Sequence, residues 1–250
     1  MAGATNGITL VTGASGSIGR ATVRALAERR CTVVSADRRP LLEPEATMVR
    51  KHLEIDLGND DSGAEALASL PSGEGLQHVI AIAGGGDAEE LSQADPATED
   101  VRIFSRVVAN NLHTAFVTIR HVVPPLREAS GNRSITLVGS INAFGGYGAP
   151  GYSAAKAGLI GLANALATPL GADGIRINCL ALGTVDTENL HHLAESRGAP
   201  LDLASIAARA PLKRVLEPAE VAGALVAMAF DMPGLTGASV ILDNGQTRIR

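Results

Sequence analysis

The glycine-rich segment at residues 13–19 is the feature that most restricts how this chain can fold. The apolar run before it, residues 8–12, predicts a short strand, and residues 18–29 carry apolar side chains at helical spacing. A second run of β-branched and apolar residues, 32–36, predicts another strand. Strand, tight turn, helix and strand in this order indicate a βαβ unit, in which the two strands are parallel.

The same alternation continues through the rest of the chain. Further strands are predicted at 79–83, 134–138, 175–181 and 239–242, and helices at 101–123, 152–170 and 219–230. The strand segments are apolar without alternation, as expected when helices cover both faces of a parallel sheet. No internal repeat or low-complexity linker divides the chain. We therefore predict a single α/β domain over residues 1–250, a doubly wound (Rossmann) parallel sheet with helices on both faces.

The stretch 184–212 is polar and charged, and it separates two regular blocks. A connection of this length inside a compact α/β domain is more often functional than not, so we predict that it forms a cap over a substrate site. The alternative is a solvated helix pair without ligand contacts.

Composition argues against several classes of protein. The chain has 21 Lys and Arg against 26 Asp and Glu, a formal net charge of −5, and no run of like charges, so neither nucleic acid nor a membrane surface is an expected partner. Cys31 and Cys179 stand far apart and form no Cys-x-x-Cys pair, so we expect both to be small buried side chains at strand positions in a reducing compartment. Without a signal-like start or a run of about 18 apolar residues, a cytoplasmic protein is predicted.

The position of the glycine turn between a strand and a helix predicts a dinucleotide site. Gly13 allows a tight exit from the strand, Gly16 leaves the backbone bare beside a pyrophosphate, and Gly19 lets the helix pack closely on the sheet. A purely structural turn is the alternative.

The end of the second predicted strand bears on the choice of nucleotide. Asp37 stands eighteen residues after Gly19, where a carboxylate can bind adenosine ribose hydroxyls and repel a 2′-phosphate, which favours NAD. Arg38 and Arg39 follow directly, and a 2′-phosphate binds guanidinium groups well, so NADP is not excluded. Both arginines could instead point to solvent.

Tyr152 and Lys156 form a Tyr-x-x-x-Lys pair in a chain that has only two tyrosines. A spacing of four residues places both side chains on one face of a helix, so the ammonium can stabilise the phenolate and lower the phenol pKa from its ordinary value of about 10. Tyr152 is therefore a candidate acid or base near neutral pH. The alternative is a surface helix on which neither residue has a function.

With these motifs in place, the chain resembles the short-chain dehydrogenase/reductase family over essentially all 250 residues. It is similar to the members of classical length, with an atypical glycine motif in which Ser17 replaces a usual glycine. The resemblance rests on residues that stand in the family's order: the glycine turn, Asp37, Asp56 after a strand, Asn111 in Asn-Leu-His-Thr-Ala-Phe, Ser140, the Tyr152 and Lys156 pair, and Leu-Asp-Asn-Gly at 242–245.

The resemblance implies a catalytic tetrad. Ser140 would hydrogen-bond the substrate oxygen, and Tyr152 would transfer the proton. Lys156 would lower the pKa of the phenol and bind the nicotinamide ribose, while Asn111 would anchor a water that relays protons. The cofactor-binding set that it implies is Gly13, Ser15, Gly16, Ser17, Ile18, Gly19, Asp37, Arg38, Asp56 at the adenine ring, Leu57, Ala83, Gly84, Tyr152, Lys156, Gly183, Val185 and Thr187.

Residues near the predicted cap are candidates for contacts with substrate. Phe144 and Tyr147 follow Ser140 in a chain with few aromatic residues, and we expect them to line the substrate side of the cleft, with packing under the cap as the alternative. His191 is a further candidate. No metal site is expected, because the adjacent His191 and His192 would point about 100° apart on a helix and lack a neighbouring ligand cluster.

Together these features predict an NAD(P)-dependent oxidoreductase that interconverts a secondary alcohol and a ketone, with a small molecule as substrate. Two alternatives stay open: a lyase or epimerase that retains NAD through its cycle, and a non-enzymatic nucleotide-sensing protein. The family resemblance also implies a homo-oligomer, a tetramer or dimer, built from the helices that hold Asn111 and Tyr152.

Overall fold

The computed structural model describes residues 7–58, 61, 63, 65–66, 75–145, 149–198 and 200–248. In this part of the chain, seven parallel strands form one sheet in the order β3-β2-β1-β4-β5-β6-β7. The strand order reverses between β1 and β4, which is the switch point of a doubly wound sheet. The strands are β1 (Ile8–Thr12), β2 (Thr32–Asp37), β3 (Lys51–Glu54), β4 (Leu76–Ala81), β5 (Arg133–Ser140), β6 (Ile175–Leu182) and β7 (Ser239–Leu242).

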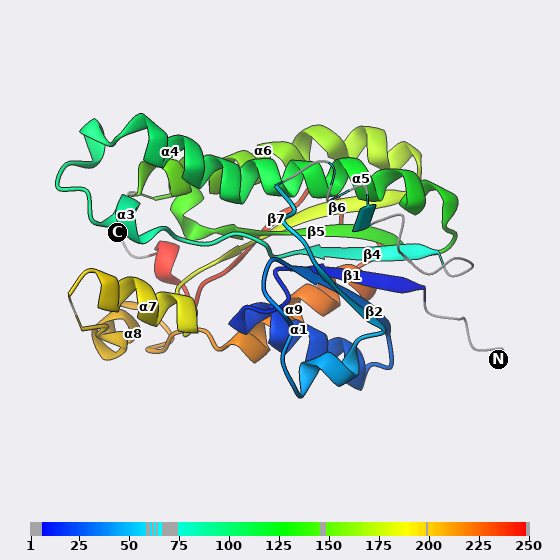
Figure 1. Ribbon diagram of the computed structural model, residues 1–250, viewed down its shortest axis with the longest axis horizontal. Coiled ribbons are helices and arrows are strands. Elements are labelled where there is room, and N and C mark those ends of the chain that lie inside the picture. The colour runs from blue at the N-terminus through cyan, green and yellow to red at the C-terminus, as the bar shows by residue number, and fades with distance from the viewer. Residues whose placement is uncertain are drawn as a thin grey trace.

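Helices cover both faces of the sheet, so the predicted fold class is confirmed. Figure 1 shows α4, α5 and α6 on one face and α1 and α9 on the other. The helices are α1 (Ser17–Glu28), α3 (Ala88–Leu91), α4 (Val101–Val108), α5 (Thr114–Glu128), α6 (Pro150–Ala172), α7 (Glu188–Ser196), α8 (Leu203–Arg209) and α9 (Pro218–Phe230). None of these described helices is both long and apolar enough to cross a membrane.

The central strands are apolar along their whole length because each one packs against two layers. In β5, Leu137 lies in the core beneath α5 and α6, and the next residue, Val138, lies in the core beneath α1 and α9. Cys179 and Leu180 of β6 divide between the two cores in the same way. Each such fully buried side chain contributes about 1.5–3 kcal/mol to the stability of the fold.

Two sequence-based expectations about local structure need correction, and the residue range of one strand was missed. The predicted helix 101–123 consists of α4, a π-helical turn at Ala109–His113, and α5, which continues to Glu128. The edge strand β3 was not predicted as a residue range, because its four residues are mostly polar and only Leu53 is buried. Cys31 is buried as expected, but it lies just before β2 rather than within the strand.

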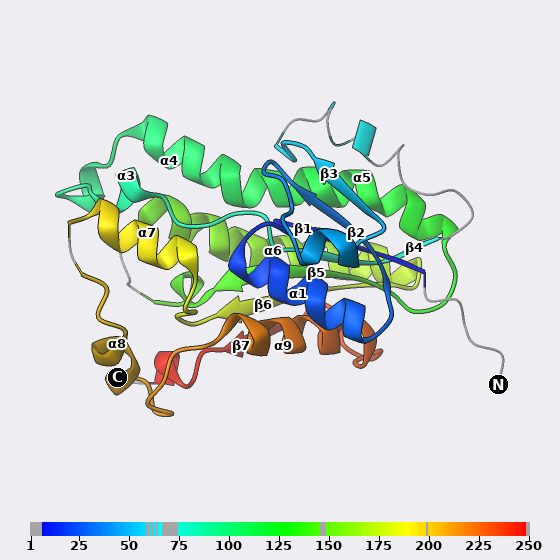
Figure 2. The same cartoon turned by 60° about the horizontal axis from the view of Figure 1, so that its bottom comes forward.

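The polar stretch 184–212 contains the helices α7 and α8, and neither of them has a buried residue. Both lie at the same end of the molecule as α3 in Figures 1 and 2, and α7 contacts α3. The amide of Glu188, the first residue of α7, donates a hydrogen bond of 3.1 Å to Ser17 Oγ at the start of α1. This stretch therefore packs on the segment that the sequence identifies as the phosphate-binding turn.

Candidate active site

The candidate site lies at the carboxyl ends of the strands on either side of the switch point. The glycine turn follows β1, a second glycine-containing loop follows β4, and Ser140 ends β5. Ligands of doubly wound sheets bind in the crevice at this position.

The glycine turn has the backbone that the sequence predicts. Gly13 has a φ of +67°, and a Cβ placed there would lie 2.7 Å from the amide nitrogen of Ala83. A Cβ at Gly19 would lie 2.2 Å from the carbonyl oxygen of Gly13, so the start of α1 could not pack as it does with any larger residue.

Gly16 differs from the other two glycines, because the protein itself leaves room for a side chain there. A Cβ at this position would make only an ordinary contact, 3.5 Å from the Gly13 carbonyl oxygen. Gly16 is also the N-cap of α1 and provides no side-chain hydrogen bond to the first turn of that helix. The bare backbone and uncapped helix N-terminus fit a bound diphosphate, whose oxygens would accept from these amides.

Asp37 joins the end of β2 to the glycine turn. One carboxylate oxygen accepts a 3.0 Å hydrogen bond from the amide of Ser15, and the other accepts one of 3.0 Å from the amide of Arg39. The carboxyl group is buried, while the side chains of Arg38 and Arg39 are exposed. Asp37 thus stands where the sequence places a ribose-binding carboxylate, with two cationic side chains beside it.

Asp56 and Leu57 follow β3, and the predicted contact of Asp56 with adenine stays a prediction. Asp56 Oδ1 accepts a 3.0 Å hydrogen bond from the amide of Gly58, and Leu57 is buried in the core. Ala83 donates its amide to Thr12 Oγ1 over 3.3 Å, which ties the loop after β4 to the end of β1.

Asn111 lies in the π-helical turn, and its side chain is fully engaged. Its amide nitrogen donates to the carbonyl oxygens of Gly85 and Val107, each over 3.0 Å, and its Oδ1 accepts from the amide of Gly85 over 2.9 Å. A Cβ at Gly84 would lie 2.6 Å from the same Oδ1. Asn111 therefore holds the loop after β4 against α4, and π-helical turns of this kind frequently mark functional sites. The proton-relaying water stays a prediction.

Ser140, Tyr152 and Lys156 come together between β5 and α6. The Ser140 hydroxyl lies close enough to the Tyr152 phenol to lower the pKa of that phenol. Ser140 Oγ donates to Asn142 Oδ1 and accepts from the amide of Asn142, each over 3.2 Å. Lys156 is buried, its Nζ donates to the Val138 carbonyl oxygen over 3.0 Å, and the same nitrogen lies 5.4 Å from the centre of the Tyr152 ring.

The electrostatics of this trio differ in one respect from the prediction. Burial raises the pKa of Tyr152 above its ordinary value, and the nearby Ser140 hydroxyl opposes that rise. Lys156 is not among the groups that shift this pKa, and its Nζ donates to the Val138 carbonyl oxygen. Burial also lowers the pKa of Lys156 to about 8, and a nearby Cys179 thiolate would oppose this.

Phe144, Tyr147 and His191 are the residues predicted to line the substrate side of the cleft. Phe144 is about half exposed, at 48%, so it is not packed under the cap. Tyr147 lies outside the described residues. His191 is exposed, and its Nε2 lies 2.7 Å from a carboxylate oxygen of Asp186.

An open groove of about 410 Å³ lies between the starts of α1, α7 and α9. Thr187 caps the N-terminus of α7 through its hydroxyl, which accepts from the amide of Leu190 over 3.2 Å. Within the described ranges, no group of three or more His, Cys, Asp or Glu side chains is arranged to hold a metal ion. The groove is lined by Ser17, Asp186, Thr187, Glu188, His191, His192, Glu217 and Pro218.

Gly183, Val185 and Ile18 are also among the residues predicted to bind the cofactor. Gly183 packs so closely that a Cβ there would lie 2.5 Å from Gln246 Oε1. Val185 is buried and pairs with Leu216 in an isolated parallel bridge, and Ile18 packs on the core beneath α1 and α9.

Two charged residues of the site were not found from the sequence. The Arg20 guanidinium forms an ion pair with Glu188 of the cap and donates to the Ser15 carbonyl oxygen over 3.2 Å, which places a cation beside the glycine turn. Glu90 accepts a hydrogen bond from the amide of Tyr152 over 2.9 Å. Arg20 could have been noticed as a basic residue directly after the turn, whereas Glu90 is 62 residues from its partner and has no local signal.

Comparison with known proteins agrees with this geometry. A family model described as enoyl-(acyl carrier protein) reductase matches residues 13–247. The chain is 32% identical to cis-4-hydroxycyclohexanecarboxylate dehydrogenase from Sinomonas cyclohexanicum, over 97% of each chain, and 31% identical to L-rhamnose 1-dehydrogenase (NAD(P)(+)) from Azotobacter vinelandii, over 94% of each. A crystal structure of an oxidoreductase of the short-chain dehydrogenase/reductase family from Burkholderia thailandensis superimposes with a TM-score of 0.86 at 29% identity, covering 99% of this chain and 95% of the other.

A parallel sheet with a nucleotide-type turn at its switch point, beside a serine, a tyrosine and a buried lysine, defines an oxidoreductase of the Rossmann type. The chain belongs to the short-chain dehydrogenase/reductase family, as a member of classical length. Proteins of this family bind NAD or NADP and act on small molecules.

Proposed function

We propose that this protein is an NAD(P)-dependent oxidoreductase that interconverts a secondary alcohol and a ketone, with Tyr152 as the general acid and base. The observation that carries the proposal is the convergence of Ser140 at the end of β5 and Tyr152 in the first turn of α6 with the buried Lys156 ammonium, which lies 5.4 Å from the centre of the Tyr152 ring. These groups provide a hydrogen-bond donor, a proton donor and a cation at the place where doubly wound sheets bind ligands.

A bound nicotinamide would accept a hydride from the alcohol carbon or give one to the ketone carbon. In the direction of reduction, Ser140 donates a hydrogen bond to the carbonyl oxygen, and Tyr152 transfers its phenolic proton to that oxygen as the alcohol forms. In the direction of oxidation, the Tyr152 phenolate takes the hydroxyl proton. In this proposal the positive charge of Lys156 would stabilise the phenolate once Nζ turns from the Val138 carbonyl towards the phenol oxygen, which would offset the cost that burial imposes on that phenolate.

The nucleotide would be held by the glycine turn and by the ends of β2 and β4. NAD is the favoured form, because the Asp37 carboxylate would repel a 2′-phosphate. Arg38 and Arg39 are exposed beside it and supply the guanidinium groups that NADP would need, so both nucleotides belong in the test. Titration of the protein with NADH and with NADPH, followed by nicotinamide fluorescence, measures the preference directly.

The stretch 184–212 is proposed as the substrate cap of a single domain, and the helices that hold Asn111 and Tyr152 as the surface of a dimer or tetramer. Phe144, Tyr147 and His191 would face the substrate. The relatives named above act, by their names, on a cyclic hydroxy acid and on a sugar. Cyclic hydroxy acids, sugars and the corresponding ketones are therefore the first compounds to screen with either nucleotide.

The decisive experiment is the Tyr152→Phe variant. Because only the proton transfer is removed, we expect kcat to fall by about 10²–10⁴ while nucleotide affinity stays within a few fold of the unmodified protein. Retained turnover in this variant would refute the proposed role of Tyr152. Product formation without a net change in nicotinamide absorbance would instead support a lyase or epimerase that retains its nucleotide.

A further inference from the structure

The N-terminus of α6, which carries Tyr152, has no cap from its own segment. Its N-cap residue, Ala149, has a left-handed backbone with a φ of 53° and a side chain that cannot accept a hydrogen bond. Pro150 follows and has no amide hydrogen. The amides of Gly151 and Tyr152 are therefore the first free donors of the helix, and they need an acceptor from elsewhere.

Glu90, on the short helix α3, supplies that acceptor. Its Oε1 lies 2.9 Å from the amide nitrogen of Tyr152, and the amide of Gly151 interacts with the same carboxyl group. The Glu90 side chain is buried, with the residue only 3% exposed. A Cβ at Gly151 would lie 2.9 Å from Oε1, so the glycine permits this close approach.

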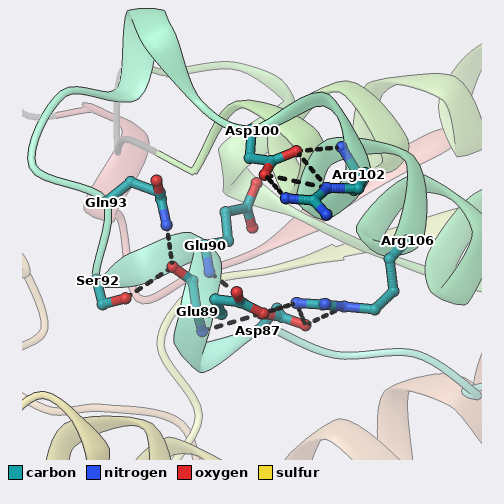
Figure 3. Close-up of polar contacts among 8 residues, drawn as sticks. All are labelled: Asp87, Glu89, Glu90, Ser92, Gln93, Asp100, Arg102 and Arg106. Atoms are coloured by element: carbon teal, nitrogen blue, oxygen red, sulfur yellow. Dashed lines mark hydrogen bonds and ion pairs between the residues drawn. The ribbon is translucent and has the colours of Figure 1, made fainter.

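The charge of Glu90 is not balanced by an ion pair within the part of the chain that the structure describes. Figure 3 shows the guanidinium of Arg106 joined to Asp87 and Glu89, with contacts of 3.0 and 2.7 Å, and that of Arg102 joined to Asp100. Glu90 Oε2 is buried without a hydrogen-bond partner among the described residues, and so are both carboxyl oxygens of Glu99. The amides at the positive end of α6 are thus the main stabilising partners of Glu90.

We propose that Glu90 is the positioning residue of Tyr152: by holding the backbone of the first turn of α6 from a separate segment, it fixes the phenol against Ser140. This inference rests on the proposed function, in which that phenol transfers the proton. It assigns a role in the reaction to an acidic residue outside the family motifs of this chain.

The same carboxylate also acts on Tyr152 through its charge. The negative charge of Glu90 raises the pKa of the phenol, in addition to the effect of burial. Burial and the nearby carboxylates raise the pKa of both Glu90 and Glu99. As the pH falls, these two carboxylates are therefore protonated at a higher pH than exposed carboxylates are. The titratable and charged groups around Glu90 are Asp87 at the N-cap of α3, Glu89 on α3, Glu99, Asp100 at the N-cap of α4, Arg102 and Arg106 on α4, and Tyr152 itself.

The first test measures ionisation of the phenol without any substrate. The chain has two tyrosines and no tryptophan, so ultraviolet absorbance of tyrosinate can be followed with little background. Subtracting the titration of Tyr152→Phe from that of the unmodified protein isolates Tyr152. In Glu90→Gln, which keeps an acceptor oxygen but loses the charge, we expect Tyr152 to ionise at a pH lower by at least about 0.5 unit.

The second test measures turnover with either nucleotide. Glu90→Ala removes the acceptor, so kcat should fall by at least about tenfold while KM for the nucleotide stays within about threefold. Glu90→Gln should keep most of kcat and shift the pH–rate profile for oxidation to lower pH, because the phenolate forms more readily. The matched control is Glu89→Gln, an exposed carboxylate of the same helix, which should change neither kcat nor the profile.

The outcomes separate the two proposals. If Tyr152→Phe is inactive but the Glu90 variants match the unmodified protein in kcat, pH profile and tyrosinate titration, Glu90 is not a positioning residue and the proposed function stands. If Tyr152→Phe remains active, the proposed function itself fails. Should Glu90→Ala not fold, Glu90→Asp replaces it, because its shorter side chain keeps the charge but withdraws the acceptor from the Tyr152 amide. A fall in kcat of about tenfold in Glu90→Asp would support the positioning role, and a kcat equal to that of the unmodified protein would overturn it.

Discussion

Replacing Lys156 by methionine should make the ligand-free protein more stable at neutral pH while abolishing its activity. Lys156 is buried, with only 3% of the residue exposed, and burial lowers the pKa of its ammonium to about 8 from an ordinary value of 10.5. At pH 7 the lysine is charged in both the folded and the unfolded chain, so the folded state bears the full cost of burying that charge. Methionine is similar in length, uncharged and able to fill irregular space.

The size of the effect follows from the pKa difference. A lowering from 10.5 to about 8 corresponds to about 3 kcal/mol of destabilisation when the lysine is protonated. Loss of the hydrogen bond from Nζ to the Val138 carbonyl offsets about 1 kcal/mol of this gain. Lys156→Met should therefore raise the free energy of unfolding at pH 7 by about 2 kcal/mol.

The dependence on pH provides a further check. Between about pH 8 and pH 10.5 the unfolded chain binds more protons at Lys156 than the folded chain, so the stability of the unmodified protein should rise with pH in this window. The advantage of the variant should shrink correspondingly.

Urea unfolding at fixed protein concentration, at pH 7 and at pH values up to about 9.5, measures both effects. The matched control is Lys213→Met, at an exposed lysine, which should change stability by less than about 0.5 kcal/mol. A Lys156→Met protein that is less stable than the unmodified one at pH 7, or whose advantage does not change with pH, would refute the reasoning.

Two other substitutions test the core and the glycine turn. His78 is buried against Phe230, and burial, with Arg176 and Arg29 nearby, lowers its pKa to about 4. Between about pH 6.5 and pH 4 the unfolded chain therefore binds more protons at His78 than the folded chain does. The free energy of unfolding should fall by up to about 3 kcal/mol as the pH drops through this window. In the His78→Gln variant, urea unfolding should show a smaller fall. Gly19→Ala should destabilise the protein by about 1–3 kcal/mol and weaken nucleotide binding, because the new Cβ would meet the Gly13 carbonyl oxygen. The matched control is Gly161→Ala on α6, where a Cβ would meet no atom of the described residues within 4 Å beyond the backbone of its own helix, so this variant should be neutral or stabilising. Thermal unfolding measures both changes in stability.

The sequence predicts the fold well where local pattern and tertiary burial agree. The segment from β1 to β2 is an example, since apolar strands, a glycine turn and an amphipathic helix follow one another without ambiguity. The helix predicted to end at 123 extends to Glu128 through Pro124 and Pro125, because burial of Leu126 outweighs the loss of two amide donors in the last turns.

The candidate site is predictable only in the part that motifs encode. Ser140, Tyr152 and Lys156 are brought together because β5 ends beside the start of α6, and the parallel sheet requires that arrangement once the strands are known. The direction of the Tyr152 pKa shift could not be foreseen, since it depends mainly on the burial of the phenol and also on the charge of Glu90, 62 residues away in the sequence. Glu90 could not be predicted, because the residue that caps a helix usually lies next to that helix in the sequence. At the N-terminus of α6 the acceptor comes from a separate segment, 62 residues before Tyr152.

The π-helical turn at Ala109–His113 also restricts how this chain can change in length. It holds one residue more than a regular α-helix would need over the same distance, and Asn111 occupies it. Deleting a single residue there would restore an uninterrupted α-helix and keep the residues after it facing the core, so Val117, Val122 and Leu126 could stay buried. The widened turn that lets Asn111 hydrogen-bond both Gly85 and Val107 would be lost, so the length of the helix at this point is fixed by that contact and not by the packing of α5.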